Sequence, residues 1–541
     1  MKKEIFESQK KIYHYMRRKA LNYEHYFSPE IQSYQENHEQ YSHRPFETSS
    51  LEELYESVFT SDIIYLGDFH TFDQNLKNFL RLTQRCIAAQ IPLCFALEML
   101  TQDHLKYVHA YFSGDITELE FLESIKYHDS WRFPWTHYKK IFELAKLHDI
   151  SIVGLGSKGN IKSRDEKAAS LIVQTKKKYP NLQIFVFFGE YHIVPNKLPL
   201  LVEKKIKACK FKHKIDYLII HQNLESPYWR IVQNHKSLKT YKILKFNNKE
   251  FCIISSPPWM KYESMCYWYE NLMDDPDYDI HEYIIENGLK IFTGTTQENF
   301  ELICKHIIKN FKLKINENDL DYNIYDHSNL EFIESEIESH LPGNLKYFFK
   351  HLIETNQSFI IPKTNRLYCS NYSINRLTKL ASLFLLSLYG QKDIDLLINN
   401  KLNFFYYFLH QKMISYFWAK SINPYLKCNL YADIKKKLKK GPFLNQQNGL
   451  FLSKVYFDNR MELLKTIPKL DFYLIYEIAT TCGEILGENL YLYIHRCDEK
   501  KALQLIHKII KKIPLKKEEW IKFEKKMISK SHFKEQEKTF F

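Results

Sequence analysis

Two histidines occur in the same short motif in two distant parts of the chain. GDFH at 67–70 follows the apolar run IIYL, and GEYH at 189–192 follows the apolar run IFVFF. A glycine lets the backbone turn sharply and leaves room for a ligand beside the imidazole. An imidazole can bind a metal or transfer a proton near neutral pH. The repeated G-x-x-H motif therefore predicts that His70 and His192 serve one site.

A carboxylate interrupts a third apolar run. Glu98 lies within CFALEML at 94–100, and a carboxylate is costly to desolvate unless it is paired or bound to a ligand. Two interpretations remain open. Either Glu98 takes part in the site, or it caps a neighbouring helix or forms an ion pair with Arg164.

Apolar runs alternate with segments of helical spacing over the first half of the chain. The runs are SDIIYLGDFH (61–70), IPLCFALEML (91–100), DISIVGLG (149–156), NLQIFVFFGEYH (181–192) and KIDYLIIHQN (214–223). Strands this apolar are buried on both faces, so the order predicts an α/β fold with a mostly parallel sheet flanked by helices. YKILKFNNKEFCIIS (241–255) predicts a hairpin closed by Asn-Asn at an antiparallel edge.

Ligands of parallel α/β sheets bind beyond the carboxyl ends of the strands, where loops and helix N-termini converge. His70, Glu98, His192 and His221 each end a different predicted strand. We therefore expect the fold to gather these four side chains on one rim.

At 541 residues the chain is too long for one ordinary core. We expect a charged helical N-terminal extension over 1–48, in which a helix precedes a polar loop. The α/β domain is expected over 49–272. Lys/Asn-rich helical segments then predict a mainly α-helical C-terminal region of unknown role over 273–541.

The charge balance, 77 Lys plus Arg against 64 Asp plus Glu, favours anionic partners in general. A basic amphipathic segment at 500–530 could contact such a partner, although solvated helix faces often have this composition. No sequence motif of a specific nucleic-acid-binding protein occurs. No apolar run reaches the roughly 18 residues of a membrane span. Without a signal peptide, lipobox or CxxC motif, we expect a cytoplasmic protein with reduced cysteines.

GLGSKG at 154–159 matches the dinucleotide fingerprint G-x-G-x-x-G. The acid at the end of the next strand, Glu190, lies farther away than the roughly 20 residues expected of that motif. We therefore interpret the segment as a turn beside the rim. Ser163 is the expected N-cap of the helix that follows.

Several of these segments together resemble the ChaN-like members of the haem-binding-uptake/Tiki superfamily. They are YLGDFH (65–70), FALEM (95–99), Trp131 with HYKKIFELAKLHDISIVGL (137–155), RDEKAASLI (164–172) and FFGEYHIVPNKLP (187–199). Their order and spacing agree over about residues 55–225. Members of the superfamily include haem or iron-uptake lipoproteins and, more distantly, metal-dependent proteases and esterases. The resemblance thus implies a domain that binds haem or a metal ion.

The resemblance also implies a set of site residues. In the superfamily, the two G-x-x-H motifs, a strand-end carboxylate and a downstream arginine form the site. The corresponding residues of this chain are His70, Glu98, Arg164 and His192, with Asp165 beside the arginine. For haem, His70 or His192 is expected as the axial ligand and Tyr191 as an alternative. Arg164 would pair with a propionate. Asp68 stands where relatives commonly have Glu, which shortens that carboxylate by one methylene.

A metal-dependent hydrolase is the alternative function. His70, Glu98 and His192 would hold a divalent metal ion with an open position for water. Glu98 or Glu190 would then act as the base. A second alternative is a non-catalytic scaffold for a partner of the helical region. A wide apolar slot would favour haem, and a tight polar cluster would favour a metal.

Overall fold

The computed structural model describes residues 2–23, 28–209, 211, 214–233, 242–271, 296–316, 320–362, 364–390, 400–439, 448–496, 499–510 and 523. The chain divides into two compact units. The α/β unit comprises Lys11–His281 with Phe541, and the helical unit comprises Met1–Lys10 with Glu282–Phe540. The predicted fold class, a mostly parallel sheet flanked by helices and followed by a mainly helical region, is confirmed.

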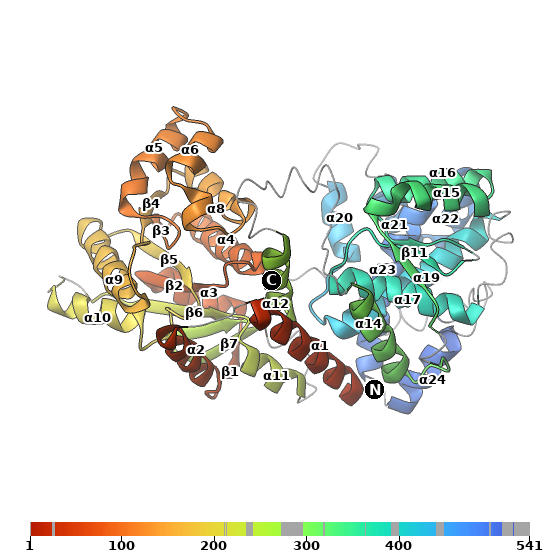
Figure 1. The fold of residues 1–541 in the computed structure, drawn as a ribbon, viewed down its shortest axis with the longest axis horizontal. Helices are drawn as coiled ribbons and strands as arrows, with labels where there is room; N and C mark the ends of the chain where they lie inside the picture. Colours follow the sequence, from red (N-terminus) through yellow and green to blue (C-terminus); the bar gives the residue numbers. More distant parts are fainter. Residues whose placement is uncertain are drawn as a thin grey trace. The chain divides into compact units, whose positions relative to one another are not determined.

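The described residues of the α/β unit form an eight-stranded sheet of order β1-β7-β8-β6-β2-β5-β3-β4 (Figure 1). The strands are β1 (Glu47–Ser49), β2 (Ile63–Asp68), β3 (Leu93–Leu97), β4 (Ser151–Gly154), β5 (Gln183–Gly189), β6 (Tyr217–Gln222), β7 (Ile243–Asn247) and β8 (Glu250–Ile253). All pairings from β8 to β4 are parallel. The predicted hairpin is β7–β8, but the antiparallel strand β1 forms the edge beyond it.

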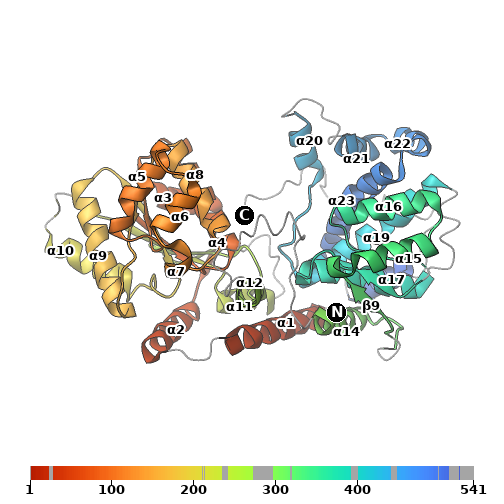
Figure 2. The same ribbon diagram turned by 45° about the horizontal axis from the view of Figure 1, so that its top comes forward.

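Helices cover both faces of this sheet (Figure 1 and Figure 2). They include α3 (Leu51–Thr60), α4 (Asp73–Ala88) and α8 (Trp135–Leu147) on one face, and α9 (Ile161–Lys178) and α10 (Leu198–Ala208) on the other. Successive side chains of a strand point to opposite faces. In β2, Ile64 and Leu66 join the first core, whereas Ile63 and Tyr65 join the second. This double burial explains why the parallel strands are apolar throughout.

The remaining helices of the α/β unit lie at its ends and in its connections. They are α2 (Pro29–Ser42), α5 (Leu105–Ser113), α6 (Glu118–Ser124), α7 (Tyr127–Ser130), α11 (Glu225–Gln233) and α12 (Trp259–Asn271), together with part of α1 (Lys2–Tyr23).

The prediction of a polar loop before residue 48 is wrong, because Pro29–Ser42 form the helix α2. The Ser28 hydroxyl caps it by accepting a hydrogen bond from the amide of Ile31 at 3.3 Å, and Pro29 occupies its first turn. The helix has no continuous apolar stripe, and Tyr34 is its most deeply buried aromatic side chain. The Ser-Pro start was the available sequence signal.

The start of α9 also differs from expectation. Asn160, rather than Ser163, is the N-cap, and its side chain accepts a hydrogen bond from the amide of Ser163 at 2.9 Å. The preceding glycines are needed for close backbone contact. A Cβ atom at Gly156 would lie 2.4 Å from the carbonyl oxygen of Glu98, and one at Gly154 would lie 2.4 Å from that of Thr101. Packing thus accounts for these two glycines of the G-x-G-x-x-G match.

The helical unit contains α14 (Thr296–Phe311), α15 (Leu330–His340), α16 (Gly343–Glu354), α17 (Ile374–Gly390), α19 (Lys401–Ile422), α20 (Tyr431–Lys439), α21 (Asn448–Asp458), α22 (Arg460–Thr466), α23 (Phe472–Arg496) and α24 (Glu499–Ile510). A small sheet of order β10-β11-β9 accompanies them, with β9 (Asn323–Tyr325), β10 (Phe359–Ile360) and β11 (Arg366–Tyr368). Within the described ranges, no helix has both the length and the apolarity to cross a membrane. The basic segment at 500–530 lies mostly outside the described residues.

The central contact of the helical unit joins α19 and α23. Two glycines one turn apart in α23 allow the backbones to approach. A Cβ atom at Gly487 would lie 2.6 Å from the carbonyl oxygen of Met413, and one at Gly483 would lie 2.8 Å from that of Leu409. Because the opposing atoms are backbone, neither contact could be relieved by a change of rotamer.

We expect Gly487→Ala to destabilise the helical unit by about 1–3 kcal/mol, because the two helices must move apart to admit the methyl group. The roughly 1 kcal/mol by which Ala favours a helix over Gly only partly offsets this loss. Urea unfolding followed by circular dichroism would measure the effect.

Gly343→Ala in α16 is the matched control, since no atom lies within 4 Å of its added Cβ. Equal unfolding midpoints for the two variants would contradict the close-packing argument.

Candidate functional site

The ends of three neighbouring strands carry the predicted site residues. β2 and β3 lie on either side of β5, and Asp68 pairs in register with Gly189 while Leu97 pairs with Phe187. His70 and His192 follow β2 and β5, and Glu98 follows β3. Adjacent parallel strands therefore bring the three side chains to one edge of the sheet.

The three side chains converge on Gly189. A Cβ atom there would lie 3.2 Å from Cδ2 of His192, 3.3 Å from Oε2 of Glu98 and 3.6 Å from Cε1 of His70. Any larger residue would enter the space that the imidazoles and the carboxylate surround. The lack of space for a side chain thus explains why the second G-x-x-H motif begins with glycine.

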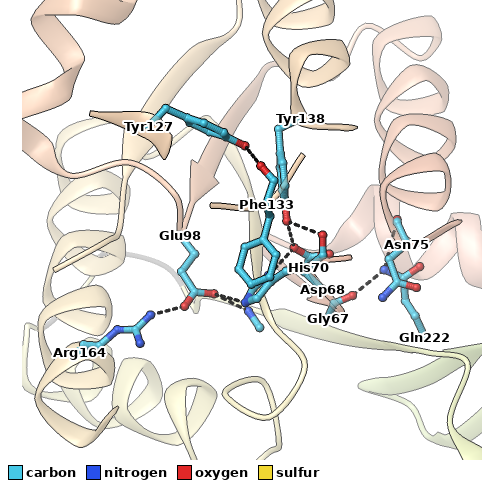
Figure 3. Close-up of polar contacts among 11 residues, drawn as sticks. Gly67, Asp68, His70, Asn75, Glu98, Tyr127, Phe133, Tyr138, Arg164 and Gln222 are labelled. Atoms are coloured by element: carbon cyan, nitrogen blue, oxygen red, sulfur yellow. Dashed lines mark hydrogen bonds and ion pairs between the residues drawn. The ribbon is translucent and has the colours of Figure 1, made fainter. Parts of the chain in front are cut away.

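His70 is held by a carboxylate from its own motif (Figure 3). Its Nδ1 lies 2.8 Å from Oδ2 of Asp68, and the Tyr138 hydroxyl donates to the same oxygen at 2.7 Å. Asp68 is buried, whereas the His70 side chain is 24% exposed. An aspartate oxygen that accepts a hydrogen bond from Nδ1 selects the tautomer with a proton on that nitrogen. Nε2, 4.0 Å from Oε2 of Glu98, is then the nitrogen able to bind a ligand.

The pKa of His70 reflects competing effects. Burial lowers it, but the hydrogen bond and charge of Asp68 and the charge of Glu98 together raise it above the usual value for histidine. Arg164 opposes this increase only weakly. The imidazole can therefore be protonated over a wider pH range than a free histidine.

Glu98 is paired on both of its oxygens. Oε1 accepts a hydrogen bond from the guanidinium of Arg164 (Figure 3). Oε2 accepts one from the amide of Gly189 at 2.7 Å. Burial raises the pKa of this carboxyl, but the charges of His192, His70 and Arg164 and the Gly189 amide lower it below the usual value. The ion pair with Arg164, left open as an interpretation of the sequence, is present in the structure.

His192 forms a second Asp–His pair. Its Nδ1 contacts Oδ1 of Asp165, and Oδ2 of Asp165 accepts a hydrogen bond from the hydroxyl of Tyr34 at 2.8 Å. The His192 side chain is 8% exposed and Asp165 is fully buried. This pair is therefore less accessible than the pair of Asp68 and His70. The sequence reading missed Tyr34, because α2 was interpreted as a loop.

Three other residues considered from the sequence have different partners. Glu190 accepts hydrogen bonds from the buried ammonium of Lys261 at 2.7 and 2.9 Å. His221 is bound through Nε2 to Oε1 of Glu250 at 2.9 Å, so the structure joins it to β8 instead of to the three converging side chains. Tyr191 is half-buried, with its ring centroid 5.2 Å from that of His38.

Aromatic side chains pack beside the His70 imidazole. The ring centroids of Trp131 and Phe133 each lie 4.7 Å from that of the imidazole, and Trp268 lies 4.8 Å from Phe133. All three aromatic residues are partly exposed. We call Trp131, Phe133 and Trp268 the aromatic wall. Phe133 and Trp268 were not singled out from the sequence, since no spacing signal relates them to His70.

Metal ligation receives no geometric support from the described residues. Among them, no group of three or more His, Cys, Asp or Glu side chains is arranged to hold a metal ion. Asp68 binds Nδ1 of His70, and Asp165 binds Nδ1 of His192. Glu98 accepts hydrogen bonds from Arg164 and the Gly189 amide. The ligand set of His70, Glu98 and His192 stays a prediction.

Comparisons with known proteins identify a relative of part of the α/β unit. Residues 54–164, about a fifth of the chain, match the family model described as "Haem-binding uptake, Tiki superfamily, ChaN". The predicted resemblance is thereby confirmed for this segment, which holds His70, Glu98 and Arg164 but ends before the second G-x-x-H motif. None of the curated proteins compared with the chain matches it.

A structure of ChaN of Campylobacter jejuni, described as showing cofacial haem binding, is similar at 16% identity with a TM-score of 0.24. The similarity covers 32% of this chain and 87% of that one.

We expect Asp68→Asn to lower the pKa of His70, because the variant removes the carboxylate charge at Nδ1. Histidine-selective ¹³C labelling and NMR titration of the Cε1–H signals would measure it. Since folding raises this pKa, protonation of His70 stabilises the wild type below about pH 6.5, and the contribution is lost as the pH rises through the folded-state pKa. The stability difference between the two proteins should therefore be larger at pH 5 than at pH 8.

Asp149→Asn is the control, because it removes an exposed carboxylate of the same unit from a left-handed position that Asn also accepts. An unchanged His70 titration in Asp68→Asn would show that the Asp68 carboxylate does not hold the proton on the imidazole.

Proposed function

We propose that the α/β unit binds haem, with His70 as an axial ligand. The observation that carries the proposal is the orientation of this imidazole: Asp68 binds Nδ1, and Nε2 remains for a metal. Metal-binding histidines commonly donate their other ring N–H to a carboxylate, which fixes the ring and increases its basicity. His70, on the exposed side of the site, has this arrangement.

The residues around His70 suit a porphyrin better than a small hydrated ion. A porphyrin is a large apolar plane, and the partly exposed aromatic wall offers apolar surface beside the imidazole. Bound haem would supply an iron centre whose ligation and surroundings this chain sets. His192 is much less exposed than His70 (8% against 24%), which favours His70 over His192 as the ligand. We assign to His192, Asp165 and Tyr34 the positioning of Glu98 and the rim.

Arg164 fits an anionic group at the edge of the ligand. Its side chain is 32% exposed, and a guanidinium has five N–H donors. The donors that Glu98 does not occupy would bind a propionate in a charge-assisted hydrogen bond. The match of residues 54–164 to a haem-binding uptake family supports the same class of ligand.

The metal-assisted hydrolase has less support. One of its proposed bases, Glu190, is bound by Lys261. The other, Glu98, already accepts a hydrogen bond on each oxygen, so a metal there would share the carboxylate with Arg164 and the Gly189 amide. Tyr191 stays an alternative haem ligand, to be distinguished by mutation.

Titration of the full chain with hemin should give a saturable, red-shifted Soret band. We expect His70→Ala to abolish this band, and Asp68→Asn to weaken the affinity by about ten- to a hundredfold through loss of the second-shell partner. His109→Ala, which removes an exposed histidine of the same unit, should bind as the wild type does.

Absence of saturable binding would overturn haem binding itself. Normal binding by His70→Ala together with loss in Tyr191→Phe would move the ligand to the phenolate. Elemental analysis of the same preparations tests the hydrolase: a stoichiometric divalent metal that is lost in His192→Ala would favour it over haem.

A further inference from the structure

The His70 imidazole lies among buried carboxyl groups. Its Nδ1 is 2.8 Å from Oδ2 of Asp68, and its Nε2 is 4.0 Å from Oε2 of Glu98. Both carboxyl groups are buried, at 5% exposure each. Asp165, beside His192, is a third buried carboxyl group of the same rim. Charges interact more strongly here than on a solvated surface, because burial removes most of the screening by water.

Arg164 does not cancel the negative charge beside His70. Its guanidinium binds Oε1 of Glu98, whereas Oε2 is the oxygen that approaches His70. The charge of Glu98 acts on the imidazole more strongly than that of Arg164, and the charge of Asp68 adds to it. Lys261, a buried cation near the rim, is held by both oxygens of Glu190. The surroundings of the imidazole therefore favour an added positive charge.

We propose, on the basis of the haem binding proposed above, that this site prefers ferric over ferrous haem. Ferric iron carries one more positive charge than ferrous iron, and the carboxylates beside His70 stabilise that charge. The hydrogen bond that Nδ1 donates to Asp68 acts in the same direction, because it increases the basicity of the imidazole. Hydrogen bonds of this kind and burial are two means by which a protein sets the reduction potential of haem.

One-electron reduction of the ligand is therefore expected to weaken its binding. The electron enters the iron, and no bond within the chain breaks or forms. The ferric and ferrous affinities are linked to the midpoint potential, so each tenfold preference for the ferric form lowers that potential by about 59 mV. A reductant of haem thus favours its release from the site, and an oxidant favours its retention.

Tyr138 moderates the effect of Asp68. Its hydroxyl donates at 2.7 Å to Oδ2, the same oxygen that contacts Nδ1 of His70. This hydrogen bond withdraws negative charge from that oxygen. Loss of the Tyr138 hydroxyl and loss of the Asp68 carboxylate should therefore have opposite effects on the potential. General damage to the packing would instead change it in the same direction in both variants.

Titration of the full chain with hemin, and with dithionite-reduced haem under argon, tests the preference. We expect the wild type to bind the ferric form more tightly by about tenfold or more. Asp68→Asn should lose about tenfold of this preference, which corresponds to an increase of about 59 mV in the midpoint potential. Glu98→Gln should raise the potential too, because Arg164 keeps its charge. Spectroelectrochemistry of the loaded proteins measures the potentials.

Two further variants separate charge from structure. Tyr138→Phe should lower the midpoint potential. Asp149→Asn, which removes an exposed carboxylate of the same unit, should leave it at the wild-type value. Circular dichroism of the apo-proteins identifies a variant that has not folded, and Glu98→Gln replaces Asp68→Asn if the latter fails.

Equal or tighter binding of ferrous haem by the wild type would overturn this inference and leave haem binding intact. An unchanged preference in both folded carboxylate variants would do the same, as would an increase in the potential of Tyr138→Phe equal to that of Asp68→Asn. Absence of saturable hemin binding would overturn the proposed function, and this inference with it.

Discussion

Burying carboxyl groups is the constraint on which the rim of the α/β unit depends. Asp68, Glu98 and Asp165 are all buried at the ends of strands or in the helix beside them. Each would be costly without a cationic or hydrogen-bonding partner. Their partners are His70, Arg164 with the Gly189 amide, and His192 with Tyr34. The pairs are not independent, because the charges of His192, His70 and Arg164 all lower the pKa of Glu98.

This network makes the two G-x-x-H motifs unequal, although their sequences are alike. In the first motif, GDFH, Asp68 binds His70 of the same motif. In the second, Glu190 turns to Lys261 and an aspartate from α9 binds His192 instead. The first histidine stays 24% exposed and lies beside the aromatic wall, whereas the second is only 8% exposed. The asymmetry is why we assign ligand binding to His70 and positioning to His192.

The helical unit is stabilised in a different way. Its central helix, α19, is buried on nearly all sides, and its aromatic side chains pack against those of α16 and α23. The two units thus depend on separate structural principles, a polar network in one and aromatic packing in the other.

The sequence by itself determined the α/β class, the mostly parallel sheet and the convergence of three strand-end residues. Double burial makes each parallel strand continuously apolar, and parallel order brings the carboxyl ends together, so both features are visible in local patterns. The partner of each polar group was decided only by the tertiary structure. Tyr34 reaches Asp165, Lys261 reaches Glu190 and Glu250 captures His221 across large sequence separations. A local pattern shows that a buried charge needs a partner, but only the packing of helices and strands determines which residue lies within reach.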